Sequence, residues 1–443
     1  MSLVRLIVLG IVALDGDIAK PGLGLSASDT AELEREVTLI LHCAATTKFM
    51  EQLRLAIEMN VLGSKRVLDL AKRCVQLRAM VHVSTCYVNS IRLGYTQIRE
   101  KIYPLGNNAR KKWLHGTRTS PGHSTVWDPY HVLEYITALS DQEMDGRVME
   151  LIAPYPNTYT FSKALGETLL QREVDEAPRL RAPLLIVRPS IVGCAQKEPL
   201  PGWMDSMIGA NGLMLACGLG ALHFMRGHPN KVADMIPVDH VANAILAIAA
   251  SGVWRGLDES VREYDSSGTP LARRSIPVYH MATSAKNPCR WDWPKSTTVQ
   301  IFSRRPPKQM VGPAYCFFVA NPVMHRVMHY LGHVLPAGVA DLGQILKGKK
   351  TKFVSATQKL DTAISSLAFF TTNQWFFACD NVDALLDQLS GADRVQFEFD
   401  VRNLSWEHYF VTYSDGLKRF LLKEDPEELR STDEITPALR SRL

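Results

Sequence analysis

Short apolar runs alternate with longer amphipathic stretches through the first half of the chain. Runs bounded by turn residues are typical of buried parallel strands, and four are found, at residues 5–14, 37–41, 79–83 and 184–187. Helices are predicted between them, at residues 26–36, 49–74 and from about residue 158. This alternation predicts an α/β fold with a doubly wound parallel sheet, whose ligand crevice lies beyond the carboxyl ends of its strands.

The pattern changes in the rest of the chain. Residues 91–156 are polar, with one helix predicted near residues 132–140, and they have the composition of an insertion at the carboxyl edge of the sheet. Less regular stretches before residue 308 predict a substrate-side subdomain. From about Met310 the pattern is helical and contains a group of aromatic residues that we expect in a core. We therefore predict a Rossmann-like domain over residues 1–308 and a mainly helical domain over residues 309–443.

Two polar residues, Tyr159 and Lys163, stand out in the helix predicted after Asn157. Their spacing of four residues puts a phenol and an ammonium on one helix face, one turn apart. A phenol titrates near pH 10, and a neighbouring ammonium lowers that pKa. Tyr159 is therefore a candidate proton donor to a carbonyl oxygen that receives hydride, although an ordinary amphipathic helix can carry the same two residues.

Composition excludes few classes of protein. The net charge of +5 over 443 residues is small and scattered, so nucleic acid is not an expected partner, although a phosphorylated cofactor is compatible with it. The eight cysteines are dispersed without a framework spacing, which favours reduced thiols. The uncharged, glycine-rich residues 207–222 are short for a membrane span and are expected to be buried or to face substrate, with peripheral membrane contact as the alternative.

Two further motifs suggest other chemistry only weakly. His325, His329 and His333 recur every four residues, but no carboxylate completes a metal site, and Gly332 with Pro336 indicates a helix end with a solvated face. We predict no metal. Asp239 and His240 would need a nucleophile elbow to form a hydrolase triad, and the sequence has no Gly-x-Ser-x-Gly.

Together, a series of short motifs resembles the fatty acyl-CoA reductases, the alcohol-forming branch of the extended short-chain dehydrogenase/reductases. The order of these pieces makes the resemblance specific, and it covers nearly the whole chain. The matching residues are 16–18 (GDI), 23–26 (LGLS), 42–45 (HCAA), 60–63 (NVLG), 82–89 (HVSTCYVN), 155–163 (YPNTYTFSK), 187–190 (VRPS), 199–203 (PLPGW), 236–239 (IPVD), Trp406 and Tyr409.

The resemblance implies reduction of a long-chain acyl-CoA to a fatty alcohol through a bound aldehyde, with NADPH as the cofactor, in wax or ether lipid metabolism. Tyr159 would donate the proton, Lys163 would lower its pKa and bind the nicotinamide ribose, and Thr85 would hydrogen-bond the developing oxyanion. The other positions expected to bind or border the cofactor are Asp17, Ile18, His42, Ala44, Ala45, Asn60, Arg188, Pro189 and Ser190. Asp17 and Ile18 would flank the adenine, and Asn60 is expected to order backbone rather than perform chemistry.

The chain departs from the family at the glycine-rich turn that holds the pyrophosphate. Residues 22–24 and 218–220 contain only two glycines each, so neither stretch is interpreted as the phosphate-binding turn. We therefore expect the chain to begin near the family's third strand, so that either the sheet lacks its first strands or residues 4–12 occupy the central position. The expected consequence is weak NADPH binding or none.

The last three residues of the chain resemble a targeting signal. Ser441-Arg442-Leu443 is similar to the peroxisomal signal Ser-Lys-Leu, which predicts a peroxisomal location, with the endoplasmic reticulum surface or the cytoplasm as alternatives. Two other functions stay open. One is a related short-chain reductase acting on another substrate, and the other is a catalytically impaired protein that binds lipid or a partner. The sequence does not indicate an oligomeric state.

Overall fold

The computed structural model describes residues 10–108, 127–176, 182–257 and 275–424. The chain divides into two compact units, of which the first comprises Met1–Ile91, Glu100–Arg188 and Leu246–Tyr279. The second comprises Arg92–Arg99, Pro189–Ile245 and His280–Leu443. This division differs from the boundary predicted at residue 308, because segments on both sides of that position build the second unit.

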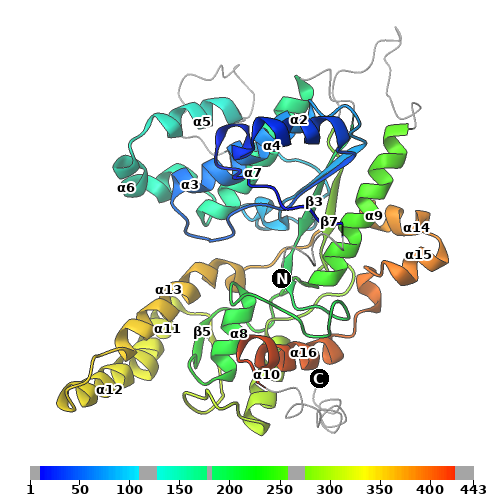
Figure 1. Ribbon diagram of the computed structural model, residues 1–443. Helices are drawn as coiled ribbons and strands as arrows, with labels where there is room; N and C mark the ends of the chain where they lie inside the picture. Colours follow the sequence, from blue (N-terminus) through cyan, green and yellow to red (C-terminus); the bar gives the residue numbers. More distant parts are fainter. Residues whose placement is uncertain (1–9, 109–126, 177–181, 258–274, 425–443) are drawn as a thin grey trace. The chain divides into compact units, whose positions relative to one another are not determined.

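A four-stranded sheet in the order β1-β2-β3-β7 frames the first unit (Figure 1). Its strands are β1 (Leu39–His42), β2 (Ala79–Val83), β3 (Leu184–Pro189) and β7 (Val278–Met281). β1, β2 and β3 are parallel, with Leu39 opposite Ala79 and Met80 opposite Leu184. Three predicted strands are therefore confirmed.

The predicted strand at residues 5–14 is wrong for its described part. Residues 10–14 are not in a strand, and Ile11 and Val12 are 50% and 79% exposed. A buried parallel strand needs neighbours on both edges and cover on both faces, and these residues have neither within the described chain. The rest of that prediction, including a central position for residues 4–12, lies mainly outside the described residues.

Helices cover both faces of the sheet, as a doubly wound fold requires. Met80 and Ile186 pack into one core with α4 (Gly63–Ala71) and α7 (Thr158–Asp175). Ala79 and Leu185 alternate with them and point to the opposite face. There they approach α9 (Val238–Leu257) so closely that a Cβ on its Gly252 would lie 2.6 Å from Leu185 Cδ1. The predicted fold class is confirmed.

The remaining helices of the first unit are short. They are α2 (Ala27–Glu36), α3 (Leu53–Ile57), α5 (Pro129–Ala138) and α6 (Asp141–Ile152), with the single turns η1 (Pro21–Gly24), η2 (Glu58–Leu62), η3 (Cys86–Asn89) and η4 (Leu105–Asn108). α5 is the helix predicted in the insertion. α6 was not predicted, because only Met144, Leu151 and Ile152 are buried in it. A capping box between Ser140 and Glu143 begins α6.

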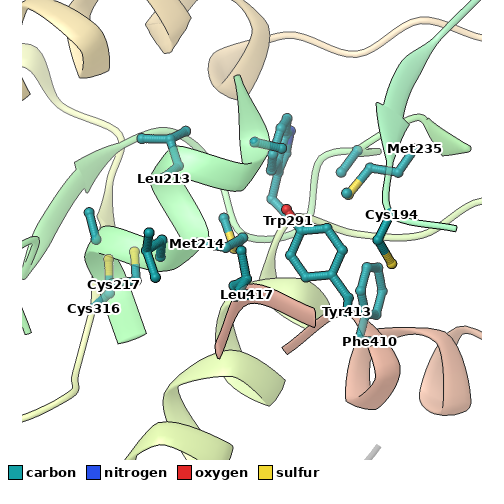
Figure 2. Close-up of a cluster of buried hydrophobic side chains, with 14 of the residues drawn as sticks. Cys194, Leu213, Met214, Cys217, Met235, Trp291, Cys316, Phe410, Tyr413 and Leu417 are labelled. Atoms are coloured by element: carbon teal, nitrogen blue, oxygen red, sulfur yellow. The ribbon is translucent and has the colours of Figure 1, made fainter. Parts of the chain in front are cut away.

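The second unit has a core of aromatic and sulfur-containing side chains (Figure 2). Met214 and Cys217 come from α8 (Ala210–Gly218), and Phe410 and Tyr413 come from α16 (Trp406–Gly416). α10 (Asp292–Arg304) packs against both helices. Residues 210–218 are therefore buried as predicted, whereas Met207 and Ile208 at the start of the predicted stretch are 64% and 57% exposed. Trp375, Phe377, Phe399 and Trp406 are also buried, as expected of core residues.

The other elements of this unit are four short strands and a series of helices that follow residue 310, as predicted. The strands are β4 (Ile191–Gly193), β5 (Phe224–Arg226), β6 (Met235–Pro237) and β8 (Phe317–Val319), and the helices are α11 (Pro322–His329), η7 (Tyr330–Val334), α12 (Leu335–Leu346), α13 (Phe353–Thr372), α14 (Asp380–Gln388), α15 (Gly391–Gln396), η8 (Val401–Asn403) and η9 (Leu417–Leu421). None of the eight cysteines forms a disulfide. Among the described residues, no helix combines the length and apolar character that crossing a bilayer requires.

Candidate active site

Tyr159 and Lys163 lie in the first turns of α7, where the sequence predicts a helix. Asn157 is its N-cap, and the Asn157 side chain accepts a hydrogen bond of 2.8 Å from the Thr160 amide. This bond satisfies one of the free amides at the helix start and fixes where the helix begins. Tyr159 and Lys163 consequently share one face of α7.

A close approach between α7 and η2 fixes the position of the helix. A Cβ on Gly166 would lie 2.8 Å from the Asn60 carbonyl oxygen, so only glycine permits this contact. The Asn60 side-chain amide donates to Ser162 Oγ at 2.9 Å and to the Thr46 carbonyl at 3.1 Å, and it accepts from the Thr46 amide at 3.0 Å. Asn60 therefore orders backbone around the site, and its contact with a cofactor stays a prediction.

The Lys163 ammonium lies at the carboxyl end of β2. Its Nζ donates a 2.9 Å hydrogen bond to the Val83 carbonyl, and the side chain is buried. Burial lowers the pKa of Lys163 to about 8. Electrostatic attraction to Glu167 and to Cys43 partly opposes this lowering of the pKa. The group therefore exchanges its proton much closer to neutral pH than an ordinary lysine does.

Thr85 lies directly beyond β2, and its side chain is close enough to the Tyr159 hydroxyl to influence the pKa of that phenol. The Tyr159 ring also stacks on Phe49, with centroids 5.8 Å apart. Burial raises the pKa of Tyr159 to about 12, and Thr85 only partly opposes this rise. The sequence predicts the opposite direction. The difference arises because burial disfavours the phenolate, while the Lys163 ammonium is held at the Val83 carbonyl.

Two imidazoles stand beside the ammonium. The rings of His42 and His82 are 5.1 Å apart, and His42 Nε2 lies 3.2 Å from Ser64 Oγ. Burial, followed by the charge of Lys163, lowers the pKa of His42 to about 4 and that of His82 well below its usual value. Both rings are therefore neutral at physiological pH.

Some buried polar atoms near the end of β2 have no partner among the described residues. They are both ring nitrogens of His82 and the Ser84 hydroxyl. Buried polar groups normally form hydrogen bonds, so these atoms suit a polar ligand. Neither residue was a predicted site residue, although both belong to the run His82-Val83-Ser84-Thr85 that leads to Thr85.

The Arg188 guanidinium is buried inside the first unit, and the cofactor contact that the sequence suggests for this residue stays a prediction. Its guanidinium is fully buried and forms a paired hydrogen bond with Glu167, with Nε to Oε1 at 2.9 Å and Nη2 to Oε2 at 2.5 Å. It also donates to the Lys101 carbonyl. These bonds direct the guanidinium into the core, because a buried charge needs a buried partner. For Pro189 and Ser190, which begin the next segment of the second unit, cofactor contact stays a prediction.

The remaining predicted positions lie in loops of the first unit. Asp17 is exposed and its carboxylate accepts a hydrogen bond from the Ala19 amide, while the Ile18 carbonyl accepts one from Arg66. Ala44 and Ala45 follow the carboxyl end of β1, on the same edge of the sheet as Thr85. Their roles in cofactor binding stay predictions.

Neither of the two glycine pairs, in residues 22–24 and 218–220, has the geometry of a phosphate-binding turn. Residues 22–24 belong to the turn η1, which follows no described strand. Residues 218–220 end α8, and a Cβ on Gly220 would lie 2.3 Å from the Gly312 carbonyl oxygen. Asp239 is also explained structurally, because its carboxylate accepts the amides of residues 196–198 and begins no triad.

The three spaced histidines are buried, which corrects the prediction of a solvated face at a helix end. The helix continues through η7 into α12, with right-handed helical dihedrals at Tyr330, Val334 and Leu335. Neighbouring rings of His325, His329 and His333 are 5.9 Å and 4.8 Å apart. No cluster of potential metal ligands is found among the described residues.

Comparison with known proteins connects this geometry to a family. Two family models, both described as male sterility protein and one of them an NAD-binding domain, match residues 7–245 and 332–424. Fatty acyl-CoA reductase 1 of Xenopus laevis is 32% identical over 98% of this chain and 74% of its own length, and that of Homo sapiens is 31% identical over the same shares. Fatty acyl-CoA reductase 2 of Bos taurus is 31% identical over 93% of this chain and 72% of its own.

A solved structure confirms the fold. The terminal R domain of the myxalamid PKS-NRPS pathway superimposes with a TM-score of 0.55 at 18% identity, covering 94% of this chain and 76% of that one. The sequence similarity to the reductases extends over nearly the whole of this chain. The chain therefore belongs to the fatty acyl-CoA reductase family.

Proposed function

We propose that this protein reduces long-chain fatty acyl-CoA to fatty alcohol through a bound aldehyde, with NADPH as the hydride source. The observation that carries the proposal is the arrangement at the end of β2, where the Lys163 ammonium binds the Val83 carbonyl and Thr85 lies close enough to Tyr159 to lower the pKa of that phenol. The substrate class is suggested by the related fatty acyl-CoA reductases 1 and 2.

The residues present fit a nicotinamide nucleotide. Ser84 Oγ and the ring nitrogens of His82 are buried without a partner among the described residues, and the Lys163 ammonium is a strong donor next to them. A ribose has hydroxyls that can both donate to and accept from such groups. When bound, the cofactor supplies hydride to the carbonyl carbon. Lys163 would hold the ribose, and Ser84 and His82 would satisfy polar atoms of the same nucleotide.

Tyr159 and Thr85 would act on the carbonyl oxygen of the substrate. Both hydroxyls can converge on one oxygen, with Thr85 stabilising its developing negative charge and Tyr159 transferring the proton. Phe49 stacks on the Tyr159 ring and restricts its orientation. Thr85, which opposes the rise in the Tyr159 pKa, would also stabilise the phenolate that remains. Thioester reduction releases CoA, and the aldehyde then needs hydride from a second NADPH and a second proton from the same hydroxyls.

The test is to incubate the full chain with palmitoyl-CoA and NADPH or NADH and to measure fatty alcohol by mass spectrometry. Tyr159→Phe should lower the rate about a hundredfold or more, because it removes the proton donor. Tyr95→Phe, which removes the hydroxyl of a half-exposed phenol elsewhere, is the matched control. Alcohol formation that survives Tyr159→Phe would remove Tyr159 from this role. Saturable acyl-CoA binding without turnover would favour the lipid-binding alternative.

The strength of NADPH binding is a separate part of the proposal. The described residues contain no glycine-rich turn between a strand and a helix amino end, and the sequence predicts weak binding for this reason. Calorimetric titration of the purified chain should give an affinity weaker than micromolar. A micromolar or tighter value would contradict that prediction while leaving the reductase proposal intact.

Peroxisomal targeting is also a proposal. It rests on Ser441-Arg442-Leu443, which lies outside the described residues. An amino-terminal fluorescent fusion should colocalise with a peroxisomal marker and become diffuse when Leu443 is deleted. A fusion that is diffuse in both forms would overturn it.

A further inference from the structure

In the continuous helical segment 322–346 (α11, η7 and α12), mainly polar side chains face the protein interior and apolar side chains face outward. Its buried strip consists of residues spaced four apart, namely His325, His329, His333, Ala337 and Asp341. Its outward stripe is apolar and contains Val327, Leu331, Leu335, Val339, Leu342 and Leu346, each between 48% and 81% exposed. Surface helices normally show the reverse arrangement.

Hydrogen bonds from the inward polar side chains fix this orientation. His333 Nε2 accepts a 2.9 Å hydrogen bond from the His223 amide, and His325 Nε2 lies 3.3 Å from the Phe224 carbonyl of β5. At the other end, the Asp341 carboxylate accepts the amides of residues 352–354, at 2.9 to 3.0 Å, where α13 begins. Rotating the segment to hide its apolar stripe would break these bonds and bury unpaired polar groups.

The segment packs on one side only. α12 lies against α13, and α11 lies against β5 and β8, all within the second unit (Figure 1). The segment is roughly 37 Å long at about 1.5 Å per residue. A contiguous apolar stripe of this length on a protein surface marks an interaction site or a membrane contact.

The distribution of charge indicates which partner fits. Arg326 is the one exposed charged residue in the segment, because the three histidines and Asp341 are buried. Directly after α12, the turn to α13 carries Lys347, Lys349, Lys350 and Lys352, all exposed, and no acidic residue occurs between Asp341 and Asp361. An apolar stripe that ends in a lysine cluster is complementary to an anionic lipid surface, with apolar side chains in the acyl boundary and ammonium groups at the phosphates.

We propose that the outward face of residues 322–346 docks the protein on an anionic membrane surface, lying in the interface rather than crossing it. The lysine turn at residues 347–352 supplies the electrostatic part of the attraction, and the apolar stripe supplies the hydrophobic part. This inference does not depend on the proposed reaction, because membrane binding is measured without substrate or cofactor.

The test is flotation of the full chain with phosphatidylcholine vesicles that contain or lack phosphatidylserine. The wild-type chain should float with the anionic vesicles and much less with the neutral ones. Leu335→Glu/Leu342→Glu, which changes two exposed side chains, should lower binding at least about tenfold. Its matched control is Val75→Glu/Val395→Glu, which puts the same charges at exposed apolar positions outside the segment and should bind as the wild type does.

Charge reversal separates the electrostatic contribution. Lys349→Glu/Lys350→Glu should lower binding to anionic vesicles about tenfold or more and abolish the preference for them, whereas Lys20→Glu/Arg35→Glu, at exposed cations of the first unit, should not. Circular dichroism of each variant checks that the fold is retained. Undiminished binding by folded Leu335→Glu/Leu342→Glu would overturn the proposal. So would a dimer, seen by analytical ultracentrifugation, that these substitutions dissociate while the wild-type chain binds no vesicles.

Discussion

Glu167 and Arg188 form a fully buried ion pair, with the guanidinium and carboxylate joined by two parallel hydrogen bonds of 2.9 Å and 2.5 Å. Glu167 lies on α7, one turn beyond Lys163, and Arg188 lies on β3. The pair therefore ties the helix that carries the candidate proton donor to the sheet that carries Thr85. It also puts a negative charge close enough to Lys163 to influence its pKa.

Breaking this pair should destabilise the first unit strongly. Glu167→Gln leaves the Arg188 guanidinium buried without its counter-charge, and such a change costs about 3–5 kcal/mol of unfolding free energy. Glu176→Gln is the matched control, because Glu176 forms its ion pair with Arg172 on the exposed side of the same helix and should contribute less than about 1 kcal/mol. Urea unfolding midpoints followed by tryptophan fluorescence measure both. Equal midpoints for the two variants would refute the structural role of the pair.

The same carboxylate should set the alkaline limit of the proposed reaction. Burial lowers the pKa of Lys163 to about 8, so its ammonium is lost as the pH rises through that value, and the reductase rate should fall there. Glu167 opposes this lowering of the pKa. Folded Glu167→Gln should therefore shift the fall in rate to lower pH, whereas Glu176→Gln should leave it in place. An unchanged alkaline limb in Glu167→Gln would show that Lys163 is not the group that titrates.

Buried imidazoles should make the protein less stable in mild acid. Burial lowers the pKa of His333 and of His42 to about 4 each. Unfolded imidazoles take up protons near pH 6.5, so between these values the unfolded state binds more protons and the unfolding free energy falls as the pH falls. Each imidazole contributes up to about 1.4 kcal/mol per pH unit.

Unfolding midpoints at about pH 7 and about pH 5 measure this dependence. His333→Gln should reduce the difference between the two midpoints. His408→Gln, at an exposed imidazole on α16, should leave the difference as it is in the wild type. A difference that is the same in all three proteins would contradict the assignment to His333.

Gly166 should tolerate no side chain. An added Cβ would lie 2.8 Å from the Asn60 carbonyl oxygen, so Gly166→Ala should cost roughly 1–3 kcal/mol through forced separation of α7 from η2. Gly146→Ala is the matched control, because Gly146 is in α6 with no atom within 4 Å of the added Cβ and should gain up to about 1 kcal/mol. Thermal unfolding monitored by circular dichroism should show the two variants moving in opposite directions. Parallel shifts would mean that α7 can separate from η2 without cost.

Much of the first unit follows from local sequence. The runs that form β1, β2 and β3 are short and mostly apolar, and Asn157 supplies an N-cap for α7, so strand and helix type depend on residues close in the chain. The spacing of Tyr159 and Lys163 and the adjacency of Thr85 to β2 likewise needed no distant partner. Glu167 could have been found from its position four residues after Lys163, although its pairing with Arg188 could not.

Only the tertiary structure determined whether a polar side chain with a distant hydrogen-bond partner is buried or exposed. The histidines of residues 325–333 were expected to be solvated, but His223 and Phe224, about 100 positions earlier in the chain, supply the hydrogen-bonding atoms that keep them inside. The Arg188 guanidinium is buried against Glu167, a pairing that the sequence does not reveal, while its predicted contact with a cofactor stays a prediction. In each case the cost of a buried, unpaired polar group is removed by an atom that only the fold brings near, whereas helix and strand formation depend on neighbours that the sequence already places together.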